Sequence, residues 1–154
     1  MNKPIRGKDY IGVGVGAVIF NDKGLVFLSK RGKEVRNESG KWEFPGGGLD
    51  FMEDPKVAVV RREMKEEYDI EIEVIDLLGF DNHIVKDEGH HWVAPTYITK
   101  LISGEPKIMK PHKCGEIGWF TIEEVKNLEL SIISQANLRD LLAKKEDLLI
   151  FIAY

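Results

Sequence analysis

Two hydrophobic periods alternate along the chain, and the changes between them divide it into strands and helices. Ile11 to Phe20 is apolar and rich in β-branched residues, which predicts a strand. A turn sequence at 21–24 followed by apolar residues at 25–30 predicts the return strand of a hairpin. Further strands are predicted over 42–44, 71–80, 91–101 and 116–120, and polar loops over 32–41, 81–89 and 104–115. Pro95 within the strand 91–101 indicates a bulge or an edge position.

Helical signals follow three polar start sequences. Asp54 and Pro55 form a good start, because aspartate accepts hydrogen bonds at a helix N-cap and proline suits the first helical position. A second helix is predicted to begin at Thr121, which has a glutamate three residues on, and a third to cover 131–145. Apolar residues recur along the first helix at Val57, Val60, Met64 and Tyr68, and along the third at Ile132, Ile133, Leu138, Leu141 and Leu142.

This order of elements predicts an α/β (α+β) fold in which a mixed sheet is packed between helices, as a single domain over residues 1–154. The final residues, Leu148 to Tyr154, are too apolar to be left exposed. They are expected to form either an added strand or part of a subunit contact, so a homodimer is a hypothesis.

Glycines alternate in the first strand at Gly12, Gly14 and Gly16, which leaves one face of that strand almost without side chains. Such a face permits close approach either by a ligand or by a neighbouring backbone. The sequence does not decide between the two.

Composition narrows the class of protein. The 154 residues are 43% apolar, with one cysteine and a formal net charge of −4. The single cysteine excludes an intramolecular disulfide framework and agrees with a cytoplasmic location. The negative charge argues against general affinity for nucleic acid, and the absence of a long apolar run argues against a membrane span.

The candidate chemistry lies on the first predicted helix. Glu63, Glu66 and Glu67 lie three and four residues apart and therefore share one face, with Arg62 as the nearest cation. One interpretation is a solvated charged face. The other is a site for Mg²⁺ or Mn²⁺, which prefer carboxylate oxygens and also bind phosphate. The glycine turn at 45–48, immediately upstream, favours the metal site.

This stretch, about 46–70, resembles the box of the Nudix hydrolase family, Gly-x5-Glu-x7-Arg-Glu-U-x-Glu-Glu-x-Gly-U, where U is a bulky aliphatic residue. Met52 and Asp69 stand where the family has glycines, and one residue is inserted. Counting forward from Gly46 and Gly47 makes Glu53 the first box glutamate and Arg61 the arginine. Counting back from Glu66 and Glu67 instead gives Arg62 as the arginine. We assign Arg62, because it neighbours Glu66 whereas Arg61 would lie close to the apolar stripe. Counting back from Arg62 would give Asp54 the place of the glutamate, but Asp54 is better explained as the helix cap, so we assign Glu53. A bulge in the helix is expected to absorb the inserted residue.

The resemblance implies the Nudix αβα sandwich and Mg²⁺-dependent cleavage of a pyrophosphate linkage in a nucleotide. Glu63, Glu66, Glu67 and the Gly46 carbonyl would bind the metal ion, Arg62 would orient the glutamates, and Glu53 would assist metal binding or proton removal.

Other sequence features resemble the MutT type, which predicts conversion of an NTP or dNTP to the monophosphate and pyrophosphate. Arg31, Trp119 and Glu116 lie where members of the family contact substrate. Two alternatives are an ADP-ribose or nucleotide-sugar substrate and a catalytically impaired domain that only binds a nucleotide. The four histidines show no metal-ligand spacing, so surface or hydrogen-bonding roles are expected for them.

Overall fold

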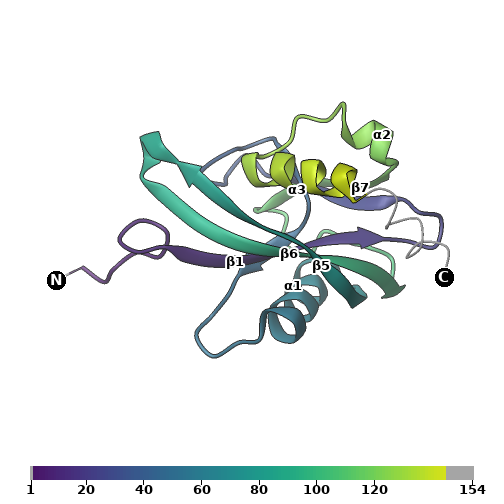
Figure 1. The fold of residues 1–154 in the computed structure, drawn as a ribbon, viewed down its shortest axis with the longest axis horizontal. Coiled ribbons are helices and arrows are strands. Elements are labelled where there is room, and N and C mark those ends of the chain that lie inside the picture. The colour runs from purple at the N-terminus through teal and green to yellow at the C-terminus, as the bar shows by residue number, and fades with distance from the viewer. Residues whose placement is uncertain (1, 145–154) are drawn as a thin grey trace.

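A computed structural model describes residues 2–144, and the apolar segment 148–154 lies outside the described residues. Within that range a mixed sheet of seven strands carries α1 on one face and α2 and α3 on the other (Figure 1). The predicted α/β sandwich is therefore confirmed.

The sheet is ordered β3-β2-β1-β6-β5, with β4 paired to β1 and β7 paired to β2. Among the strand pairs of residues 2–144, β1 and β6 run parallel and all the others run antiparallel. The strands are β1 Gly12–Phe20, β2 Val26–Arg31, β3 Trp42–Glu43, β4 Gly46–Gly48, β5 Glu71–Val85, β6 His90–Ser103 and β7 Cys114–Phe120.

The helical segments are a π-helical turn at Pro55–Val59, α1 Val60–Tyr68, a 3₁₀ turn at Lys86–Glu88, α2 Ile122–Val125 and α3 Ile132–Ala143. The cap predicted at Thr121 is present, since its side chain accepts from the Glu124 N–H. Ser131 caps α3 in the same way by accepting from the Ser134 N–H.

Two apolar clusters pack on opposite faces of the sheet because successive side chains of a strand point to opposite sides. In β1, Val15, Ala17 and Ile19 join the cluster that contains Val60 and Met64 of α1. Val18 and Phe20 join the second cluster, which contains Leu141 of α3. The alternating glycines of β1 therefore face the side of α3.

Residues 81–85, predicted as a loop, instead continue β5. They pair antiparallel with β6, from Asp81 opposite Ala94 to Val85 opposite His90. Pro95 lies in an interior strand rather than at an edge, since β6 stands between β1 and β5. The pairing of β1 with β6 is interrupted between Val93 and Thr96, where proline has no N–H to donate.

The buried face of α3 differs from the predicted apolar stripe. Ile132 and Leu142 are exposed, while Ser134 and Asn137 are buried. The buried polar groups are satisfied, because Ser134 Oγ accepts from the Phe44 N–H at 3.0 Å and Asn137 Nδ2 donates to Thr96 Oγ1 at 3.0 Å.

Across residues 2–144, the helices are too short or too polar to cross a membrane.

Candidate active site

The segment entering α1 absorbs the inserted residue in a π-helical turn, as predicted. Asp54 caps it, with Oδ1 accepting from the N–H groups of Lys56 at 2.8 Å and Val57 at 3.3 Å. Because a π-turn takes one more residue per turn than an α-helix, the α-helical register is restored from Val60 onward. Val57 belongs to the π-turn and is 55% exposed, so its predicted place in the buried stripe was wrong.

Both positions where the family has glycine adopt left-handed backbone conformations. Met52 has φ +68° and Asp69 has φ +56°. Aspartate tolerates this region better than most residues, and Asp69 also pairs with Lys65 Nζ at 3.0 Å. Met52 is 89% exposed and has no burial to offset the strain of its conformation.

Arg62, not Arg61, is the arginine of the cluster. Its Nε donates to Glu53 Oε2 at 3.2 Å and its NH2 to Glu53 Oε1 at 3.0 Å. Its NH1 lies 3.3 Å from Glu63 Oε1 and 3.5 Å from Glu66 Oε2. The hydrogen bonds from Arg62 lower the pKa of Glu53, so that carboxylate stays ionised. Arg61 is exposed at a hollow that Arg62 and Lys65 also line.

Glu63 also adjoins Glu67, and its carboxyl lies against the glycine turn. The Glu63 carboxyl fills the space that a side chain at Gly47 would need, since a Cβ there would lie 2.6 Å from Glu63 Cδ. Burial and the adjacent negative charge of Glu63 raise the pKa of Glu67 to about 7. Glu67 is therefore a carboxyl whose charged form is disfavoured, because it is buried beside another acid.

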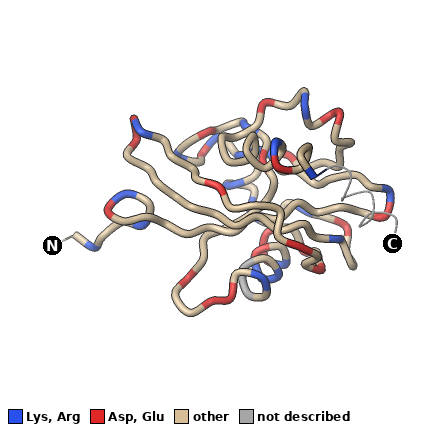
Figure 2. Tube along the Cα trace, in the orientation of Figure 1, with Lys and Arg blue, Asp and Glu red and all other residues tan. Residues whose placement is uncertain are grey.

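This donor set fits a hard divalent cation. It consists of carboxylate oxygens, and a cation bound there would offset the repulsion between Glu63 and Glu67. Acidic and basic residues gather on α1 and on the loop before it (Figure 2). Glu66 is half exposed and turned toward Arg62, and among the described residues no three potential ligand side chains are already gathered as a metal site. Gly46 lies in β4 opposite Gly16, and its role as a ligand stays a prediction.

A cavity of about 360 Å³ opens beside the glycine turn, on the α3 side of β1. Gly47 belongs to its lining and also touches Glu63, so the turn joins the cavity to the glutamate pair. The cavity is bounded by Gly14 and Gly16 of β1, Gly46–Gly48 of β4, Trp92, Ala94 and Thr96 of β6, Ile133 and Asn137 of α3, and Arg31, Asn37, Glu43, Phe44, His83 and His90.

The glycine face of β1 packs closely against its neighbour and also borders the cavity, and approach of a ligand to this face stays a prediction. A Cβ at Gly12 would lie 2.6 Å from the Trp92 indole, and one at Gly16 would lie 2.9 Å from Thr96 Oγ1, so the face packs tightly against β6. Gly14 and Gly16 also line the cavity and leave its wall flat.

Arg31 lies in the cavity wall but is held by neighbours. Its NH1 is 3.3 Å from both carboxylate oxygens of Glu43, and its Nε and NH2 donate to Asn37 O and Oδ1, each at 3.0 Å. Burial raises the pKa of Glu43, although Arg31 partly offsets that effect. A substrate contact by Arg31 stays a prediction.

The structure does not bring Trp119 and Glu116 to this cavity. Both lie on β7, where Trp119 packs against Phe27 with ring centroids 5.4 Å apart. Glu116 is largely exposed, 4.0 Å from Lys30 Nζ. Their assignment rested on the family pattern alone.

Sequence reasoning missed several cavity residues. His83 Nε2 lies 3.2 Å from Glu38 Oε2, and His90 Nδ1 lies 3.4 Å from Asn37 Nδ2. These contacts join strands β5 and β6 to the loop 32–41, which local sequence patterns could not reveal. Asn137 did leave a signal, as an amide inside an otherwise apolar helical period.

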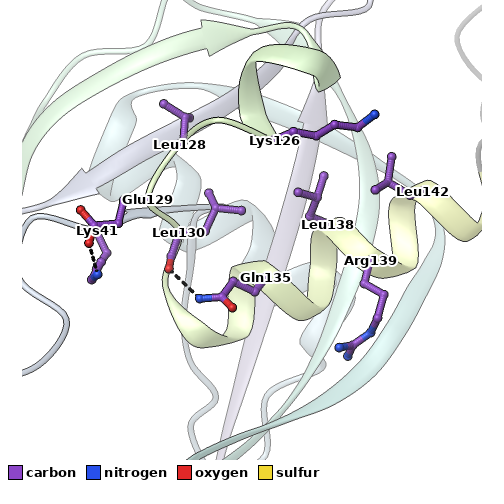
Figure 3. Close-up of a pocket in the computed structure, with 9 residues that line it drawn as sticks. All are labelled: Lys41, Lys126, Leu128, Glu129, Leu130, Gln135, Leu138, Arg139 and Leu142. Atoms are coloured by element: carbon purple, nitrogen blue, oxygen red, sulfur yellow. Dashed lines mark hydrogen bonds and ion pairs between the residues drawn. The ribbon is translucent and has the colours of Figure 1, made fainter.

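A second hollow, of about 490 Å³, lies between α3 and the segment leading to it (Figure 3). Its lining includes Leu128, Leu138 and Leu142, and Lys41 forms an ion pair with Glu129 at its edge. None of the site residues predicted from the sequence borders it.

Known proteins resemble this chain in sequence. A sequence model of the NUDIX domain matches residues 11–141. The RNA pyrophosphohydrolase of Gluconacetobacter diazotrophicus is 38% identical over 84 residues, 52% of this chain and 44% of that protein. The aligned region thus spans less than half the length of that relative. A MutT-like protein of Streptomyces ambofaciens is 29% identical over 113 residues, 73% of this chain and 66% of that protein.

Solved structures resemble it in fold. The MutT NUDIX hydrolase from Burkholderia pseudomallei superposes with a TM-score of 0.77 and 36% identity, covering 86% of this chain and 98% of that one. The NUDIX domain of Shewanella oneidensis NrtR, crystallised with ADP ribose, gives a TM-score of 0.69 at 19% identity and covers 88% of each chain.

Proposed function

The chain belongs to the NUDIX family of hydrolases, which act on pyrophosphate linkages, and we propose that its substrate is a nucleoside or deoxynucleoside triphosphate that it converts with Mg²⁺ to the monophosphate and pyrophosphate. The observation that supports this proposal is the contact of Glu63, which adjoins Glu67, with Gly47, a residue that also lines a cavity of about 360 Å³.

Each residue of the cluster has a distinct part in the proposed reaction. Glu63, Glu66 and Glu67, with the Gly46 carbonyl, would hold the cation. Arg62 keeps Glu63 and Glu66 in place through its NH1, and Glu53 fixes Arg62 through two hydrogen bonds. When bound, the cation would neutralise negative charge on the diphosphate and lower the pKa of a coordinated water.

The cavity is suited to the nucleoside. Its volume lies within the range of small-molecule sites, and it combines apolar surface from Trp92 and Ile133 with the amide of Asn137. The glycines of β1 leave the wall flat enough for a planar base. On this side α3 contributes Ile133 and Asn137 to the cavity wall.

A triphosphate at the 5′ end of RNA is the second candidate substrate, since relatives such as that of Gluconacetobacter diazotrophicus are named RNA pyrophosphohydrolases. The reacting group is the same, but an oligonucleotide needs an open path for its chain and cations along its backbone. The net charge of −4 favours the free nucleotide. An ADP-ribose-type substrate stays an alternative, because a structural neighbour binds ADP ribose.

A substrate panel with both products measured tests the proposal. It contains NTPs, dNTPs, ADP-ribose, nucleotide sugars and a short 5′-triphosphate RNA, each with Mg²⁺ or Mn²⁺. We expect monophosphate and pyrophosphate in equal amounts from a free nucleotide. Preferential cleavage of the RNA would reassign the substrate, and binding of nucleotides without turnover of any compound would indicate the impaired, binding-only domain.

Glu66→Gln and Glu67→Gln test the metal site within that panel. Loss of a metal ligand should lower kcat at least a hundredfold, equivalent to ~2.7 kcal/mol. Glu88→Gln is the matched control, because Glu88 is exposed in the 3₁₀ turn between β5 and β6. Unchanged turnover in both variants would refute the metal site. The homodimer and the cytoplasmic location stay predictions.

A further inference from the structure

A second arginine, Arg6, reaches the loop that carries the candidate site. Its NH1 donates to the Leu49 carbonyl at 2.7 Å and lies 3.3 Å from Asp50 Oδ1. This loop joins β4 to the capped start of α1, so Arg6 contacts the segment that sets the position of Glu53.

The N-terminal hook, residues 5–10, is built to present Arg6 at this place. Gly7 N–H donates to Tyr10 O at 2.8 Å, and Ile5 N–H donates to Asp9 Oδ2 at 2.7 Å. The hook is tied to β6 because His91 N–H donates to Gly7 O at 2.8 Å. These bonds hold the backbone of the hook, so Arg6 extends from a fixed base.

Glycines make room for this arrangement. The Arg6 guanidinium carbon lies 5.3 Å from the centre of the Trp92 ring, a cation–π contact. The indole fills the space beside Gly7 and Gly12, where a Cβ would lie 2.1 Å and 2.6 Å from ring atoms. A Cβ at Gly48 would lie 2.8 Å from Arg6 NH2.

Asp50 stands between two arginines. Its Oδ1 is 3.3 Å from Arg6 NH1, and its Oδ2 is 3.9 Å from Arg62 NH2. Arg62 also contacts Glu53, Glu63 and Glu66, so a closer ion pair between Arg62 and Asp50 would compete with those contacts. Without Arg6, Arg62 would be the cationic side chain left beside the Asp50 carboxylate among the described residues.

We propose that Arg6 is a positioning residue for the reaction: it neutralises Asp50 and so prevents that carboxylate from drawing Arg62 away from Glu63 and Glu66. The proposal rests on the proposed function, because the geometry that Arg6 protects is that of the metal-binding glutamates. Arg6 itself need not touch the substrate.

Three variants separate this role from simple support of the fold. Arg6→Ala should lower kcat about tenfold with KM changed less than threefold, because a positioning effect acts on the transition state. Adding Asp50→Asn removes the competing charge and should restore kcat to within about threefold of the wild type. Lys8→Ala, an exposed cation on the same hook, is the control and should leave kcat unchanged.

A measurement on the protein without metal or substrate gives an independent readout. The NMR resonance of the Arg62 Nε–H group should shift in Arg6→Ala and return in the double variant. Wild-type kcat in Arg6→Ala, a double variant as slow as Arg6→Ala, or an unmoved Arg62 resonance would each overturn the proposal. If the wild type cleaves no nucleotide, the proposed function fails, while the resonance still decides the role of Arg6.

Discussion

A methyl group added at Gly47 should damage catalysis without damaging the fold. An alanine Cβ would lie 2.6 Å from Glu63 Cδ and 2.9 Å from Glu63 Oε1, whereas ordinary contacts of a Cβ are 3.4–4 Å. The carboxyl must therefore move by about 1 Å, a displacement that can cost about a hundredfold in rate at a preorganised site. We expect Gly47→Ala to lower kcat by about that factor.

Stability should respond in the opposite direction. The displaced atoms are the end of a flexible side chain, so the clash is relieved by rotation of Glu63. Gly47 is not among the residues with positive φ, so alanine fits its backbone. The lower entropy of the unfolded alanine chain should then leave the free energy of unfolding unchanged or raise it by about 0.5 kcal/mol.

The assay compares kcat, Mn²⁺ affinity and thermal unfolding in the wild type and four variants: Gly47→Ala, Gly115→Ala, Glu63→Gln and the double variant. Gly115→Ala is the control, because a Cβ there meets only Gly32 Cα at 3.9 Å. Gly47→Ala combined with Glu63→Gln should lose no more activity than Glu63→Gln alone, since both changes act on the same carboxylate. Activity of Gly47→Ala within threefold of the wild type, or losses that multiply in the double variant, would refute the reasoning.

Three stability predictions concern other positions. Burial and the neighbouring Asp140 raise the pKa of Asp81 to about 6. Protonated Asp81 therefore adds to the free energy of unfolding at pH 4, and this contribution is lost as the pH rises through 6. Asp81→Asn should therefore be more stable than the wild type at pH 7 by about 1 kcal/mol, a value already reduced for solvent screening. Near pH 4 the two proteins should be equally stable, and urea titrations at both pH values check this. Asp54→Ala removes the cap of the π-turn and should lower the free energy of unfolding by about 1 kcal/mol in the same titration, and an unchanged midpoint would contradict it. Met52→Gly removes the backbone strain of φ +68° at an exposed side chain. It should raise the free energy of unfolding by about 0.5 kcal/mol after the greater entropy of the unfolded glycine chain is subtracted. A lower melting temperature would show that Met52 makes a contact of its own.

The sequence by itself determined the features that depend on neighbours in the chain. Asp54 and Pro55 mark the helix start, the inserted residue predicts a bulge, and the spacing from Glu66 selects Arg62 over Arg61. The α/β class followed from the alternation of hydrophobic periods. All of these are set by backbone geometry within one or two turns, which local patterns record directly.

Tertiary structure decided the features that depend on pairing across the fold. Residues 81–85 became strand because β6 supplies hydrogen-bond partners along their whole length. Asn137 is buried while Ile132 is exposed, because Thr96 of β6 offers the Asn137 amide a partner on the sheet face that α3 covers. The cavity likewise unites β1, β4, β6 and α3, and Arg6 reaches the loop before α1 from a distant part of the chain. Such contacts join residues far apart in sequence, so no local period encodes them.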